Sequence, residues 1–141
     1  MSIRTVTHIN LRGNAREALE FYRSVFGGDL VAVTYADLRA VTEPQEADRL
    51  SWGQVTSPAG FHVMAFDVPS ARPYDQGVSS YFVSVRGTDA DEISRYWHRL
   101  REGATIVSDL APSAWAPLYG MLTDRFGVTW TLDVATEYVP S

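Results

Sequence analysis

Two residues that could take part in chemistry, a histidine and an asparagine, stand close together on a short stretch that alternates like a β-strand. His8 and Asn10 lie on one face of residues 6–11, because successive side chains of a strand point to opposite faces. His8 could act as a general base, a metal ligand or a hydrogen-bonding side chain in a cleft wall. Asn10 could orient a ligand carbonyl or satisfy the backbone. These alternatives stay open, because a lone histidine says little until a partner fixes its tautomer.

One further histidine and one aspartate complete the candidate metal ligands. The sequence has no cysteine, so a metal would need His, Asp or Glu. His62 and Asp67 belong to the mostly apolar stretch 61–68, and a hydrogen-bonded structural role is the favoured interpretation for His62. His98 stands beside Arg99 on the side of a helix that we expect to face solvent. His62 and Asp67 are therefore weak metal candidates, and His98 is not a candidate.

A second polar row lies near the end of the chain. In residues 128–134, Trp130 and its apolar neighbours point to one face, while Thr129, Thr131 and Asp133 point to the other. A row of this kind is typical of a sheet face that meets solvent or a ligand. We therefore predict that Thr129 and Thr131 bind a ligand on the wall of a cavity.

The aromatic residues divide into packing and binding candidates. Trp97 falls on the apolar stripe of a helix and Trp130 alternates with core residues, so both are expected in the core. Trp115 stands in a loop before the final hairpin, and Phe82 lies among serines. We predict ligand contacts for Trp115 and Phe82, because pockets are lined mainly by aromatic and apolar side chains. Trp52 is ambiguous.

Composition bounds the class of protein. Hydrophobic residues make up 45% and charged residues 21% of 141 residues, as in one folded globular domain. The net charge is −5 and lysine is absent, which argues against a nucleic-acid partner. No run of apolar residues has transmembrane length and the first residues do not resemble a signal peptide, so we expect a cytoplasmic protein that does not bind membranes.

The elements that position these residues follow from periodicity. The strands expected in the first half are 6–11, 30–35, 50–56 and 61–68. An amphipathic helix begins after Asn14, a capping residue with Glu17 three positions later, and stops at Gly27-Gly28. Residues 36–48 form a surface excursion that could hold a helical turn, and 57–60 form a hairpin turn.

The same order starts again after a linker at 69–77. Asp89 caps a second helix that ends before Gly103, and Asp124 fixes the last turn by accepting backbone N–H groups. The expected strands are 78–85, 104–110, 119–123 and 128–134. We predict one α+β domain with two βαβββ modules, 1–68 and 78–141, repeated with a period of about 75 residues.

Two blocks of this chain resemble the glyoxalase and bleomycin-resistance superfamily, also called vicinal oxygen chelate proteins, and within it the PhnB-like branch. They are residues 13–28, which read GNAREALEFYRSVFGG, and residues 119–121 with 124–130, which read YGM and DRFGVTW. The resemblance implies paired βαβββ modules whose curved sheets surround a cleft, and a homodimer. In the enzymes of the superfamily it also implies a divalent metal held by four His or Glu residues on the cleft strands.

The metal ligands carry over poorly. His8 matches the first ligand position, whereas the second falls on Ser80 and the last on Thr131. In the fourth strand only His62 and Asp67 are at hand. Hydroxyls are poor primary ligands for divalent transition metals. Methyl transfer, an activity attached to some PhnB-like chains, has no sequence feature here.

We therefore predict a homodimeric, metal-free protein that binds a small, partly aromatic molecule and needs no cofactor. The residues expected to bind it are His8, Asn10, Ser80, Phe82, Trp115, Thr129 and Thr131. The alternative is a divalent-metal-dependent lyase, isomerase or dioxygenase-type enzyme that uses His8 with His62 or Asp67.

Overall fold

A computed structural model describes residues 2–135, and its contacts divide the chain into two compact units, with the boundary in the sequence between Gly77 and Val78. Each unit holds one helix and four strands in the order β-α-β-β-β. No helix among the described residues is long and apolar enough to cross a membrane. The predicted fold class, α+β with two βαβββ modules, is confirmed.

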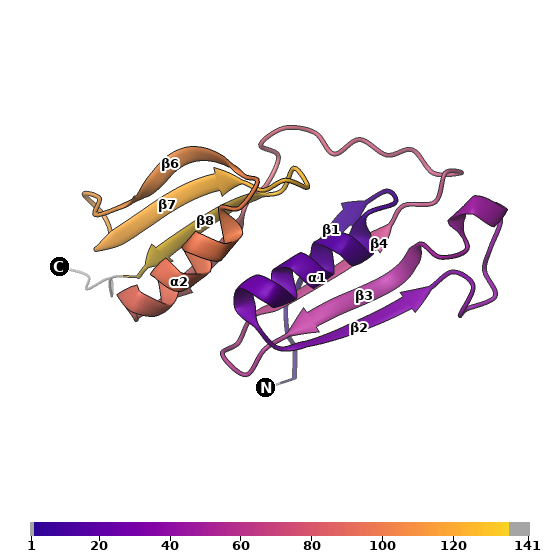
Figure 1. Ribbon diagram of the computed structural model, residues 1–141, viewed down its shortest axis with the longest axis horizontal. Helices are drawn as coiled ribbons and strands as arrows, with labels where there is room; N and C mark the ends of the chain where they lie inside the picture. Colours follow the sequence, from indigo (N-terminus) through magenta and orange to yellow (C-terminus); the bar gives the residue numbers. More distant parts are fainter. Residues whose placement is uncertain (1, 136–141) are drawn as a thin grey trace. The chain divides into compact units, whose positions relative to one another are not determined.

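The first unit builds a four-stranded sheet with the order β1-β4-β3-β2 (Figure 1). Its elements are β1 (Thr7–Leu11), α1 (Ala15–Phe26), β2 (Asp29–Thr34), the 3₁₀ turn η1 (Pro44–Glu46), β3 (Leu50–Thr56) and β4 (His62–Asp67). β1 runs parallel to β4, and the other neighbours are antiparallel. The helical turn predicted within 36–48 is η1.

The apolar stripe of α1 packs on one face of this sheet. The predicted stripe residues are all buried: Ala15, Ala18, Leu19, Tyr22, Val25 and Phe26. The helix contacts β2, β3 and β4, and Ile9 and Leu11 of β1 and Val63 and Ala65 of β4 are buried in the same unit. Because strand side chains alternate, the residues between these point to the other face of the sheet.

The second unit repeats the arrangement with the order β5-β8-β7-β6. Its elements are β5 (Val83–Gly87), α2 (Ala90–Leu100), β6 (Thr105–Ala111), β7 (Leu118–Thr123) and β8 (Thr129–Val134). Trp97 of α2 and Trp130 of β8 are buried as predicted, and His98 is exposed as predicted. A side chain at Gly120 would meet the Trp97 ring, since a Cβ there would lie 2.8 Å from it. The absence of a side chain at Gly120 thus lets α2 lie close to the sheet.

The strand predicted at 78–85 is displaced in the structure. β5 begins at Val83, which pairs with Trp130, and continues to Gly87 opposite Val134. Val78 is 92% exposed and Ser79 has a φ of 57°, a left-handed conformation that interrupts an extended chain. Pairing with β8 therefore decides where the strand starts, and Ser80 and Phe82 precede it.

Helix capping was predicted correctly for α2 and wrongly for α1. Asp89 Oδ1 accepts from the backbone N–H groups of Asp91 and Glu92 at 2.9 and 3.4 Å. Asn14 makes no side-chain capping bond. The carboxylate that holds the start of α1 belongs instead to Asp67, at the end of β4.

Candidate functional site

Each unit has a sheet face opposite its helix, here called the open face. In the first unit, the open face is formed by residues that alternate along the strands with the buried ones. They include His8, Asn10, Trp52, Gln54, His62, Met64 and Phe66. They are exposed or half-buried rather than buried. This face mixes imidazole, amide, thioether and aromatic groups, which suits a small molecule with an apolar body.

His8 and Asn10 interact directly on this face. His8 Nδ1 lies 2.9 Å from Asn10 Oδ1, and the His8 ring meets Phe66 edge-on with centroids 5.3 Å apart. Because an amide oxygen only accepts, this bond assigns the proton of the neutral ring to Nδ1 and leaves Nε2 with a lone pair. His8 is therefore oriented to accept a hydrogen bond or a proton from a bound molecule.

His62 also points to the open face, bonded to a neighbouring strand. Its Nε2 lies 2.8 Å from Gln54 Oε1, which fixes the ring on β3. Its Nδ1 is buried and has no hydrogen-bond partner within the described chain. A ring held by one nitrogen in this way fits the predicted structural histidine.

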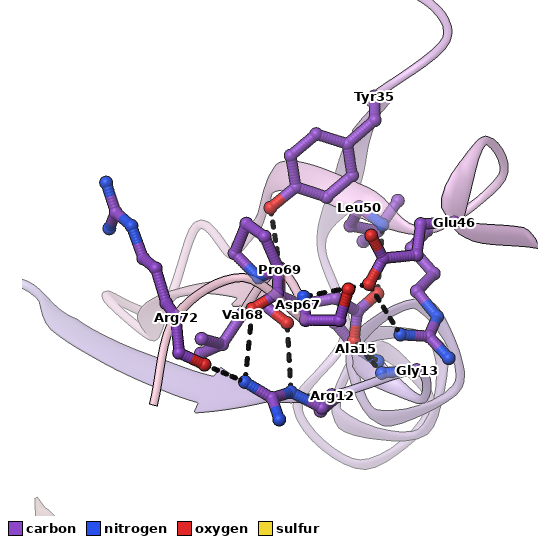
Figure 2. A network of polar contacts seen from close by, with 12 residues as sticks. Arg12, Gly13, Ala15, Tyr35, Glu46, Leu50, Asp67, Val68, Pro69 and Arg72 are labelled. Carbon is purple, nitrogen blue, oxygen red and sulfur yellow. Dashed lines mark hydrogen bonds and ion pairs between the residues drawn. The ribbon is translucent and has the colours of Figure 1, made fainter. Parts of the chain in front are cut away.

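Asp67 lies on the other face of the sheet, with Val63 and Ala65, and so does not share a site with His8. Its Oδ1 accepts from the N–H groups of Gly13 and Ala15, and its Oδ2 accepts from Leu50 at 2.9 Å (Figure 2). The residue is 2% exposed. Both carboxylate oxygens thus accept hydrogen bonds from the backbone, which favours a structural role for this weak metal candidate.

The network around Asp67 predicts a pH dependence. Tyr35 Oη donates to the Asp67 carbonyl at 2.6 Å, and the pKa of Tyr35 is raised from its ordinary 10.0, first by burial and then by the Asp67 and Glu46 carboxylates. The raised pKa favours the neutral phenol in the folded chain. The contribution of the neutral Tyr35 phenol to the free energy of unfolding is full below pH 10.0, and it is lost as the pH rises through the folded-state pKa.

Tyr35→Phe should therefore make the free energy of unfolding fall less steeply with pH in this range. Urea titrations at several pH values between about 8 and 11 measure the two slopes. Equal slopes would contradict a raised Tyr35 pKa, whatever the difference in stability at neutral pH.

The open face of the second unit carries hydroxyls and one ion pair. Its members are Ser84, Arg86, Tyr119, Met121, Thr123, Thr129, Thr131 and Asp133. Thr129 and Thr123 share a hydrogen bond of 2.9 Å between their hydroxyls. Arg86 Nε lies 3.2 Å from both oxygens of the Asp133 carboxylate. The predicted polar row of β8 is therefore on this face.

Three other predicted binding residues lie outside the strand ladder. Ser80 and Phe82 precede β5, and Phe82 is 44% exposed. Trp115 lies in the loop before β7, is 65% exposed, and meets Tyr119 edge-on with ring centroids 5.2 Å apart. Trp115 therefore contacts a residue of the open face.

The structure also shows which positions of the two units correspond. The parallel pairs β1/β4 and β5/β8 end with equivalent hydrogen bonds. Val68 N–H donates to Leu11 C=O at 2.7 Å, and Ala135 N–H donates to Gly87 C=O at 2.9 Å. Counting back from them, the cross-strand pair His8 and Met64 matches the pair Ser84 and Thr131. Ser84, not Ser80, is the counterpart of His8.

The comparisons with known proteins agree with this repeated fold. The sequence model of the Glyoxalase/Bleomycin resistance protein/Dioxygenase superfamily matches residues 5–132. This chain belongs to that superfamily. The resemblance noted from residues 13–28 and 119–130 is thereby confirmed.

Three relatives of this superfamily chain span nearly all of it. The crystal structure of protein PA1353 from Pseudomonas aeruginosa is 30% identical with a TM-score of 0.82, over 96% of this chain and 100% of that one. The PhnB protein from Bacillus cereus is 20% identical with a TM-score of 0.72, over 94% and 100%. Protein YjdN of Escherichia coli K12 is 20% identical over 92% of this chain and 94% of its own length.

The metal expected of enzymes in this superfamily does not fit the residues present. The resemblance gave His8 and Thr131 as ligand positions, and their cross-strand partners are Met64 and Ser84. Together these four residues offer one imidazole, one thioether and two hydroxyls. Divalent transition metals favour imidazole and carboxylate ligands. Within residues 2–135, no three His, Asp or Glu side chains gather closely enough to hold a metal ion.

Proposed function

We propose that this superfamily member is a homodimeric protein that binds a small, partly aromatic molecule on its open sheet faces without a metal. The observation that carries the proposal is the residue set at the four matched positions, which are His8 and Met64 in the first unit and Ser84 and Thr131 in the second. Such side chains make van der Waals contacts and neutral hydrogen bonds rather than metal bonds.

Each open face, taken by itself, carries side chains that can contact such a molecule. The first unit offers aromatic and thioether surface from Phe66 and Met64, with His8 and Asn10 as oriented polar groups. The second unit offers the hydroxyls of Thr129 and Thr131. Pockets for small molecules commonly combine a largely apolar lining with a few placed polar groups.

A metal-dependent lyase, isomerase or dioxygenase-type enzyme is the second candidate. The observation in its favour is the His8 ring, which Asn10 orients so that Nε2 presents a lone pair. That nitrogen is a competent ligand or base, but the second imidazole, His62, is engaged with Gln54. This candidate therefore requires ligands that the matched positions do not provide.

Substitutions on the open faces test the binding proposal. His8→Ala and Thr131→Val should leave unfolding cooperative and the free energy of unfolding within about 1 kcal/mol of the parent, because both side chains lie outside the helix-covered core. Both should weaken the binding of aromatic fragments, followed by ligand-observed NMR. His98→Ala, a histidine exposed on α2, is the matched control.

Two results would count against the proposal. Unchanged fragment binding in both variants would remove the open faces as the site. A loss of stability as large as that of a core variant would mean that the two faces of the strands had been exchanged.

The homodimer is tested separately by light scattering at micromolar concentration. We expect the mass of two chains. A stable monomer would contradict this part of the proposal while leaving the binding faces intact.

A further inference from the structure

The ion pair of Arg86 and Asp133 stands on the open face of the second unit. Asp133 lies on β8, a central strand, and its side chain is only 10% exposed, whereas the Arg86 side chain on the edge strand β5 is 58% exposed. A carboxylate this deeply buried is costly unless it is paired. Arg86 supplies that pairing and keeps the rest of its length at the surface.

The geometry of the pair leaves most of the guanidinium available. Nε alone approaches both Asp133 oxygens, at 3.2 Å each. The two terminal NH₂ groups make no hydrogen bond to any described residue, so four N–H donors of a planar, charged group remain for another partner. A guanidinium fixed in this way matches the planar, two-oxygen geometry of a carboxylate.

Hydroxyl and aromatic side chains lie next to the ion pair on the same face. Ser84 and Thr131 form the next cross-strand pair on the same face, and each places a hydroxyl two residues along its strand from the ion pair. On the other side of Asp133, its β7 partner is Tyr119, against which the Trp115 ring packs. Arg86 and Tyr119 are therefore two strand spacings apart, about 10 Å.

We propose that the second unit binds a small aromatic carboxylic acid, with its carboxylate on Arg86 and its ring against Tyr119 and Trp115. Asp133 is a positioning residue, because it fixes the guanidinium without meeting the ligand. The inference rests on the proposed function and adds the chemical class of the ligand. Each contact it needs comes from β5, β7, β8 or the loop before β7, all within one unit.

The test is the quenching of tryptophan fluorescence by benzoate, phenylacetate and 3-phenylpropionate, each compared with its neutral amide. Because a hydrogen bond to a charged group contributes more than a neutral one, we expect the best acid to bind about tenfold more tightly than its amide. Arg86→Met should abolish this preference for the acid. Arg125→Met is the matched control, since Arg125 lies over the Phe126 ring in the turn between β7 and β8.

Arg86→Lys is a second variant, for use if Arg86→Met leaves Asp133 unpaired and fails to fold. Lysine retains the charge beside Asp133 but lacks the planar fork, so the preference for acids should still fall severalfold. Acid binding that survives both Arg86 variants would overturn the inference. So would equal affinity of the parent for acids and amides, although the proposed binding function would then stand. Binding of neither acids nor amides would overturn both.

Discussion

Replacing Asp67 with asparagine is expected to lower the free energy of unfolding by about 3 kcal/mol, because the change removes a charge and exchanges one acceptor oxygen for an NH₂ donor. Asp67 accepts three backbone N–H groups, from Gly13, Ala15 and Leu50, in a buried setting. An asparagine keeps one oxygen and turns an NH₂ group toward an N–H donor. One buried donor then loses its partner, and the first turn of α1 loses its negative charge.

Urea unfolding followed by circular dichroism measures this effect. Asp75→Asn is the matched control, because Asp75 makes a single exposed bond of 2.9 Å to the Gly77 N–H within the linker. We expect the control to change stability by less than about 1 kcal/mol. Equal stabilities for the two variants would show that Asp67 does not hold α1, and would return its carboxylate to the list of possible metal ligands.

Trp130→Ala should cost roughly 3–5 kcal/mol of stability, the largest effect expected of a single substitution in the second unit. Trp130 is 0% exposed, and its indole Nε1 donates to Asp124 Oδ2 at 2.9 Å. The other Asp124 oxygen accepts from the N–H groups of Phe126 and Val128 in the turn. The substitution therefore opens a cavity and removes one hydrogen bond to the Asp124 carboxylate, which holds the turn of the hairpin.

Two companion variants separate these effects in thermal and urea unfolding. Trp130→Phe retains much of the ring volume but not the hydrogen bond, so its cost should fall between those of the parent and Trp130→Ala. Trp115→Ala, at a position that is 65% exposed, should change stability little. If Trp115→Ala proved as damaging as Trp130→Ala, the roles assigned to the two tryptophans would be wrong.

Local periodicity explains what could be predicted from the sequence. The alternation of residues 128–134 predicted that Trp130 is buried and that Thr131 lies on the open face, and both hold because a strand has only two faces. The stripe of α1 was equally plain. Asp89 could be predicted as a cap because its partners, Asp91 and Glu92, are its neighbours in sequence.

Features that depend on distant pairing could not be predicted in this way. The cap of α1 comes from Asp67, which is 52 positions from Ala15 along the chain, so the adjacent Asn14 was a false signal. Residues 78–85 alternate like a strand, but β5 begins only at Val83, where its pairing with β8 begins. Ser80 therefore lies before the strand, and the sequence pattern did not indicate Arg86 as a residue of the open face. One sequence signal could have placed Asp67 on the buried face of the sheet, since it alternates in phase with Val63 and Ala65.

The most direct test of the account is the metal content of the purified protein, paired with thermal-shift titrations of Ni²⁺, Co²⁺, Mn²⁺, Zn²⁺ and Fe²⁺. The residues at the four matched positions, His8, Met64, Ser84 and Thr131, predict metal far below one ion per chain and no metal-dependent stabilisation. Close to one ion per chain, lost in His8→Ala, would contradict the account and make the metal-dependent enzyme the leading function.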